Sequence, residues 1–145
     1  MNIIFTRPLI DTEDLMTNFF SSNYKVIHLP TLSITSANME PINAKEFDGL
    51  IFTSANAVRF LQLKNDEKNI KCFCVGNITE RSLRLKGFTN TVAASGTVNA
   101  LKNIILNSEK KIKNLAYLCG DVVSYDLDKD LKLSGFKIKK IINYT

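Results

Sequence analysis

The sequence predicts an open α/β sheet of parallel strands, and two observations support this fold class. Short apolar runs alternate along most of the chain with segments of helical periodicity. Two helical segments end almost identically, in LRLKGF at 83–88 and LKLSGF at 131–136, where a glycine stops the helix before the next strand. Parallel strands need crossovers of this kind, so a doubly wound parallel sheet is expected.

The first elements form a strand–helix–strand unit. We expect a strand over 2–6, a helix over 11–21 and a second strand over 24–28. Two parallel strands and one helix bury too little apolar surface to be stable alone. The helix places four apolar residues on one face, which a monomer would leave uncovered: Leu15, Met16, Phe19 and Phe20.

A second, longer α/β region follows a break at 28–48, which holds two of the three prolines and has no helical period. We interpret this break as a crossing from one sheet to another. In LIFTSANAV (50–58), a buried strand ends in hydroxyls where a helix begins. The further strands expected cover 71–75, 91–93, 114–118 and a last run ending at Ile142, and the further helices cover 79–86, 97–106 and 126–134.

Composition limits the class of protein. The 145 residues are 45% hydrophobic and 23% charged, which is typical of a globular domain, and no apolar run approaches the length of a membrane span. The amino terminus begins directly with a strand, so we expect no signal peptide. Three scattered cysteines favour a reducing, cytoplasmic environment over a disulfide scaffold.

The charge balance favours acidic partners. There are 19 basic and 14 acidic residues, a net charge of +5. The tightest basic cluster, Lys137, Lys139 and Lys140, alternates along a strand, and we interpret it as a solvated face rather than a nucleic-acid site. We therefore expect neither a nucleic-acid nor a membrane partner.

Small polar residues or glycines follow the predicted strands, at the edge where open α/β sheets bind ligands. Backbone N–H groups at helix starts there suit a polyanion. Capping is the alternative for each junction, and for Ser54 in particular. The five junctions are 6–8, 53–56, 76–79, 95–97 and 119–121.

Familiar catalytic and cofactor motifs are missing from the sequence. It contains neither GxSxG, GxGxxG nor GxxxxGK[ST]. His28, the one histidine, is interpreted as structural. Cys72 and Cys74 lie two apart on one strand, so both face the same way and favour a buried core over a zinc site. The acidic residues of DLDKD at 126–130 fit a first helical turn, and no metal or organic cofactor is expected.

These junctions together resemble uroporphyrinogen-III synthases. FTSANAV and VGNIT are the most specific of the matching pieces, and their order and spacing hold along the chain. The pieces are FTRP at 5–8, FDGLIFTSANAV at 47–58, CVGNITERSLRLKGF at 74–88, AASGTVNAL at 93–101, AYLCGDVVSYDLDKDLKLSGF at 116–136 and INYT at 142–145.

The resemblance implies two flavodoxin-like α/β domains joined by extended crossings. Residues 1–29 would begin domain one, 30–45 would cross, 46–142 would form a complete domain two and 143–145 would start the return crossing. The rest of domain one would come from a longer natural chain, a second polypeptide or a swapped copy, unless the gene is decaying and its product is inactive.

The resemblance also implies an activity, that of a cyclising lyase in haem biosynthesis. Such enzymes close hydroxymethylbilane with loss of water and inversion of the last ring, without metal or organic cofactor. Tyr144 matches the tyrosine that assists departure of the hydroxyl, whereas Cys119 stands where the family often has arginine. The substrate-binding positions implied are Arg7, Thr53, Ser54, Ala55, Gly76, Asn77, Ile78 and Thr79.

A different class of function stays open beside the enzyme. The chain would then be a non-catalytic module that binds a small anion, or a partner protein through its first strand–helix–strand unit. The uncovered helix face in that unit predicts self-association or a second polypeptide.

Overall fold

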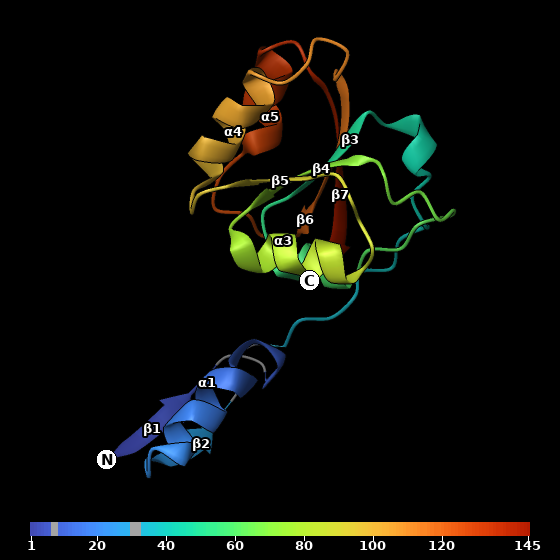
Figure 1. The fold of residues 1–145 in the computed structure, drawn as a ribbon. Coiled ribbons are helices and arrows are strands. Elements are labelled where there is room, and N and C mark those ends of the chain that lie inside the picture. The colour runs from blue at the N-terminus through green and yellow to red at the C-terminus, as the bar shows by residue number, and fades with distance from the viewer. Residues whose placement is uncertain (7–8, 30–32) are drawn as a thin grey trace. The chain divides into compact units, whose positions relative to one another are not determined.

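The computed structural model describes residues 1–6, 9–29 and 33–145. The chain divides into unit 1, Met1–Thr35, and unit 2, Ser36–Thr145 (Figure 1). The predicted site residue Arg7 and the proline at the predicted crossing, Pro30, lie outside the described residues. The finer division expected from the sequence, with a crossing over 30–45, stays a prediction.

Unit 1 is a single parallel strand–helix–strand motif, as predicted. Its elements are β1 (Asn2–Phe5), α1 (Leu9–Ser21) and β2 (Lys25–His28). The two strands pair in parallel, with Asn2 opposite Lys25. Helix α1 ends at Ser21, the predicted end, and Asn23 just beyond it takes a left-handed backbone conformation (φ 66°).

One part of the apolar face predicted for α1 is packed in the structure, and another part is exposed. Phe19 packs against Phe5, with ring centroids 6.0 Å apart, and against Tyr24 at 5.6 Å. Leu15 and Phe20 are 53% and 72% exposed. Only part of the predicted face is therefore uncovered within unit 1.

Unit 2 is built on a five-stranded parallel sheet with strand order β5-β4-β3-β6-β7. Counted within the unit, this order is 3-2-1-4-5, so the first strand is central. Flavodoxin itself has the order 2-1-3-4-5, and both orders are doubly wound with a switch point. The predicted fold class is confirmed. The strands are β3 (Gly49–Phe52), β4 (Lys71–Val75), β5 (Thr91–Ala94), β6 (Asn114–Gly120) and β7 (Lys137–Tyr144).

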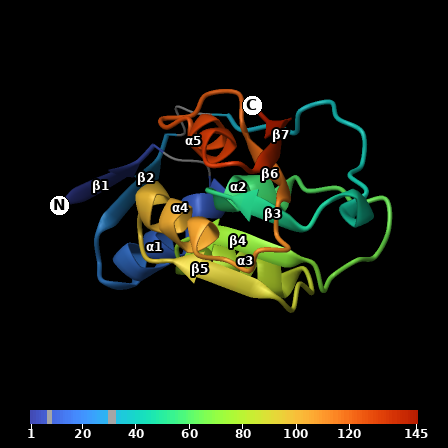
Figure 2. The same ribbon diagram turned by 90° about the horizontal axis from the view of Figure 1, so that it is seen from above.

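Helices cover both faces of this sheet (Figure 2). Strand residues alternate between the two faces, because successive side chains point in opposite directions. Cys72 and Cys74 both face α2 and α3 in the buried core, as their spacing predicted. Helices α2 (Ala55–Arg59) and α3 (Asn77–Leu85) cover one face, α4 (Val98–Leu106) and α5 (Leu127–Leu133) cover the other, and a short 3-10 turn (Ala44–Glu46) precedes β3.

The two repeated glycine stops are confirmed. Gly87 and Gly135 have φ values of 97° and 94°, which a residue with a Cβ adopts only at a cost. After each glycine the chain turns back, and the N–H of Phe88 donates to the carbonyl of Leu83 at 3.1 Å. Phe136 makes the equivalent bond. Both phenylalanines are buried against the helix that they follow.

Strand β7 continues beyond its predicted end at Ile142. A bulge lets the pairing proceed, since Cys119 lies opposite Ile142 whereas Gly120 lies opposite Tyr144. Asn143 is the extra residue, and its side-chain amide donates to the carbonyl of Ala57 at 2.7 Å. The bulge therefore places Tyr144 at the end of the sheet.

Candidate functional site

The carboxyl end of β3 and β6 is a topological switch point. The chain leaves β3 toward α2 on one face of the sheet and leaves β6 toward α5 on the other. Connections that depart to opposite faces leave a crevice between the two strand ends, and open α/β sheets bind ligands there.

A pocket of about 170 Å³ occupies this crevice. Thr53 enters it from the end of β3, Tyr117 from β6 and Tyr144 from β7. Val98, Cys119 and residues 122–125 complete the wall. None of the described residues that line this pocket carries a charged side chain. The pocket therefore offers uncharged polar groups, among them the hydroxyls of Thr53, Tyr117 and Tyr144.

Thr53 and Tyr117 are hydrogen-bonded at the base of the pocket. Their hydroxyl oxygens are 3.3 Å apart. Tyr117 is buried, and burial is the main cause that raises the pKa of its phenol, while the bond to Thr53 acts in the opposite direction. The phenol is therefore protonated at neutral pH and is able to donate a hydrogen bond.

Tyr144 lies directly over Gly120. A Cβ added at Gly120 would stand 2.8 Å from Cε2 and 3.0 Å from Cζ of the tyrosine ring. The ring also stacks on Phe60 at the end of α2, with centroids 6.4 Å apart and planes at 29°. The absence of a side chain at Gly120 thus makes room for the phenol beside the pocket.

Ser54 is the N-cap of α2. Its hydroxyl accepts a hydrogen bond of 3.1 Å from the N–H of Asn56. The geometry of Ser54 is that of a helix cap, which is the simpler of the two interpretations of LIFTSANAV. Ala55 is the first residue of the same helix. A role of either residue in ligand binding stays a prediction.

Another of the five predicted junctions, 76–79, lies at the end of the neighbouring strand β4. Helix α3 begins there at Asn77, two residues before the predicted start, because Gly76 (φ 82°) acts as its N-cap. No side chain caps this helix start, which leaves its first N–H groups directed outward. Asn77 and Ile78 are exposed, whereas Thr79 is buried with 4% of its surface accessible.

The structure therefore brings together part of the predicted set. Thr53 and Tyr144 line one pocket. Residues 76–79 lie one strand away, and Thr79 points into the protein interior. Cys119 also lines the pocket, and burial raises the pKa of its thiol.

No site role was predicted for Tyr117 or for the loop residues 122–125. Tyr117 stands within the strand predicted over 114–118, in the largely apolar run NLAYLCG. A buried phenol needs a hydrogen-bond partner, and this requirement was the one available signal. The loop has neither helical nor strand periodicity, so nothing in its pattern indicated that it would wall a pocket.

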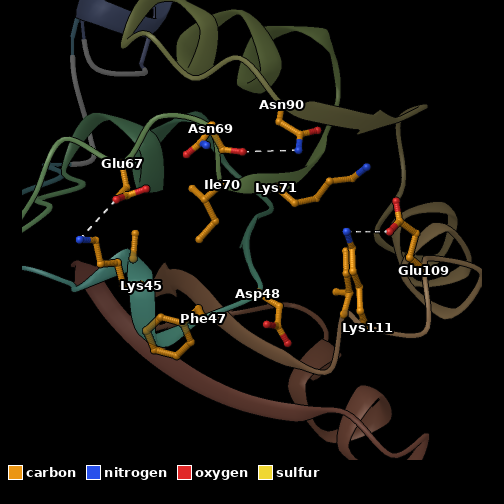
Figure 3. Close-up of a pocket in the computed structure, with 12 residues that line it drawn as sticks. Lys45, Phe47, Asp48, Glu67, Asn69, Ile70, Lys71, Asn90, Glu109 and Lys111 are labelled. Atoms are coloured by element: carbon orange, nitrogen blue, oxygen red, sulfur yellow. Dashed lines mark hydrogen bonds and ion pairs between the residues drawn. The ribbon is translucent and has the colours of Figure 1, made fainter.

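A second pocket, of about 380 Å³, opens at the opposite, amino end of the strands (Figure 3). Its charged groups largely satisfy one another. Lys45 and Glu67 point toward each other at 3.8 Å, and Lys111 lies 3.1 Å from Glu109. Asp48 accepts two backbone N–H groups. This pocket lies away from the switch point and is not the candidate site.

Residues 1–6, 9–29 and 33–145 contain no cluster of His, Cys, Asp and Glu that would hold a metal ion. In the same residues, no helix combines the length and the apolar character that a membrane crossing requires.

Fold and site together define a doubly wound α/β protein with a crevice at the carboxyl edge of its sheet. The family profile described as "Uroporphyrinogen-III synthase HemD" matches residues 13–145. The chain belongs to the uroporphyrinogen-III synthase family.

Solved structures agree on the fold. Six solved chains match, among them the uroporphyrinogen-III synthetase from Helicobacter pylori 26695. That match has a TM-score of 0.61 and 22% sequence identity, and it covers 99% of this chain. This chain spans 61% of the length of the Helicobacter pylori protein. No curated protein sequence matches.

Proposed function

We propose that this chain contributes the carboxyl-edge half-site of a uroporphyrinogen-III synthase, which cyclises hydroxymethylbilane with loss of water and inversion of the last ring. The observation that carries the proposal is the meeting of Thr53 and Tyr144 in one pocket at the switch point. Family membership supports the reaction class.

The site residues would have separate roles in the reaction. Tyr144 would give the proton that leaves with the departing hydroxyl, so that the C–O bond breaks and water is released. The N–H groups at the start of α3 and the 53–55 junction would hold carboxylates of the substrate. Arg7 is proposed, from the resemblance alone, as a further basic substrate contact. Because the pocket itself carries no charged side chain, its hydroxyl groups would be the donors to any substrate oxygen that enters it. Orientation of the flexible chain is then the main task of the site.

Product analysis tests this proposal. The purified chain is incubated with freshly generated hydroxymethylbilane, and the isomers are separated. We expect an excess of isomer III over the isomer I that forms unaided. Tyr144→Phe should lower the rate by about 100-fold if the phenol is a general acid. Tyr24→Phe, which removes a phenol that contacts Phe19 in unit 1, is the matched control. Formation of isomer I alone would mean that this chain is only part of the enzyme. Binding of uroporphyrin III that Thr53→Val and Tyr144→Phe both leave unchanged would contradict the half-site itself.

The partner and the location of the chain belong to the same proposal. Leu15 and Phe20 are exposed on α1, which supports self-association or a second polypeptide that covers unit 1. Sedimentation at several concentrations would reveal it, and a monomer at every concentration would exclude self-association. The three free cysteines, all buried, support a cytoplasmic location.

A further inference from the structure

Tyr117 is a buried phenol that the proposed reaction does not use. It lies in β6 opposite Ile51 of β3, and it faces the same side of the sheet. Thr53 is two residues beyond Ile51, so the strand period places it on that side as well. Tyr117 therefore reaches Thr53 along the diagonal of a parallel strand pair, with 3.3 Å between the hydroxyl oxygens.

Packing of the Tyr117 ring does not require its hydroxyl group. The ring fills the core between β3 and the helices α4 and α5, and a phenylalanine would fill the same space. A buried phenol oxygen costs free energy unless it is hydrogen-bonded. Its bond goes to a hydroxyl at the base of the pocket rather than to a backbone carbonyl. Packing alone therefore does not account for a tyrosine at this position.

Either hydroxyl of this pair can donate, and the phenol, the more acidic of the two, is the better donor. Burial raises the pKa of Tyr117, so its O–H persists at neutral pH and needs an acceptor. The Thr53 oxygen accepts one hydrogen bond while its own O–H is still able to rotate and donate. When Tyr117 donates, the hydrogen of Thr53 is directed to a third group, and each bond in such a chain strengthens the next.

We propose that Tyr117 is a positioning residue that donates to Thr53 and thereby directs the Thr53 hydroxyl into the switch-point pocket, toward a hydroxyl or carboxylate oxygen of the ligand. The role rests on the proposed function, because it deepens the ligand contact that was assigned to Thr53. Tyr144, held over Gly120, borders the same pocket.

A double-mutant cycle tests the role through ligand binding. The variants are Tyr117→Phe, Thr53→Val and the two combined, and the probe is uroporphyrin III, whose fluorescence change is titrated at neutral pH. Each single variant should weaken binding about fivefold, the value of one hydrogen bond. The combined variant should be no weaker than Thr53→Val alone, because Tyr117 acts only through Thr53. Thr53→Ser should restore most of the binding.

A second readout does not depend on ligand. The bond to Thr53 lowers the pKa of Tyr117 against the effect of burial, so Thr53→Val should move one phenolate transition to higher pH in an absorbance titration. Tyr117→Phe identifies that transition by removing it. Thermal unfolding of each variant shows that the fold is retained, and Tyr24→Phe is the control for loss of a remote phenol.

Failure of the positioning role can be distinguished from failure of the proposed function. Wild-type binding in Tyr117→Phe, with weakened binding in Thr53→Val, would overturn the positioning role and leave the proposed function standing. Additive losses in the combined variant would also overturn it, because Tyr117 would then act independently of Thr53. A wild-type chain that neither binds the probe nor forms isomer III would overturn the proposed function, and this inference with it.

Discussion

Gly120 and Tyr144 show how one missing side chain determines the position of another. The tyrosine ring occupies the space where a Cβ at Gly120 would be, 2.8 Å from Cε2. Such a distance is shorter than van der Waals contact permits. Gly120 is part of β6 and has no left-handed backbone, so close approach, not backbone conformation, is what requires glycine there.

We predict that Gly120→Ala displaces the phenol. The forced overlap should cost about 1–3 kcal/mol of folding free energy and should lower isomer III formation as Tyr144→Phe does. Unfolding in urea and product analysis measure the two effects. In a Tyr144→Ala background the overlap is absent, so Gly120→Ala should cost little more. An equal loss of stability in both backgrounds would show that the ring is not the obstacle.

At the scale of single residues, the sequence predicts the location of the site better than the roles within it. Thr53 and Tyr144 were identified from the resemblance and share the pocket. Two roles stayed open for Ser54, a helix cap and a ligand contact, because a hydroxyl before a helix suits both. Thr79 is buried, which its position in VGNIT did not reveal. Side-chain direction depends on the helix start, and this start was predicted two residues late.

At the scale of elements, the strands and helices were predictable because local signals agree. Apolar runs, helical periodicity and the two glycine stops all indicate the same alternation. Strand order was not predictable in this way. The central position of β3 depends on contacts between segments far apart in sequence, such as the pairing of Leu50 with Ala116. The bulge at Asn143 likewise left no local signal.

The amino ends of β3 and β6 are joined by the carboxylate of Asp48. Its Oδ2 accepts the N–H of Lys113 at 3.0 Å and of Asn114 at 2.9 Å. These two bonds hold the pKa of Asp48 below its ordinary value of 3.8. A lowered folded-state pKa means that ionised Asp48 stabilises the fold above that ordinary value. The contribution is lost as the pH falls through the folded-state pKa.

We therefore predict a pH-dependent effect of Asp48→Asn. The variant should be less stable than wild type near neutrality. The difference should shrink as the pH falls below 3.8 and through the lowered folded-state pKa, where the wild-type carboxyl also becomes uncharged. Urea unfolding across this range measures it. Asp66→Asn is the control, because that side chain is 93% exposed in a surface ion pair. A difference that does not change with pH would show that the charge of Asp48 has no role.

At the scale of the whole molecule, the two units differ in how complete they are. Both buried apolar clusters of the described chain consist of unit 2 residues. Unit 1 has two strands and one helix, with Leu15 and Phe20 exposed. Stability of the chain should therefore reside in unit 2.

We predict that residues 36–145 fold without unit 1. The fragment should unfold cooperatively at a midpoint close to that of the main transition of the full chain, as followed by circular dichroism and heating. A peptide of residues 1–35 should lack a cooperative transition, because fewer than about 40 residues seldom bury enough surface. Loss of structure in the 36–145 fragment would show that unit 2 depends on unit 1.

Unit 2 begins and ends at one place. Ser36 forms an antiparallel bridge with Tyr144, and the N–H of Ala37 donates to the carbonyl of Asn143 at 3.1 Å. A module with adjoining ends is suited to insertion into a loop of a host protein, because its own strands need not separate. Tyr144 lines the pocket, and it also forms the bridge with Ser36 at the place where unit 2 begins and ends. A ligand that binds the Tyr144 phenol would therefore also restrict motion at the Ser36–Tyr144 bridge, where such a module would join its host protein.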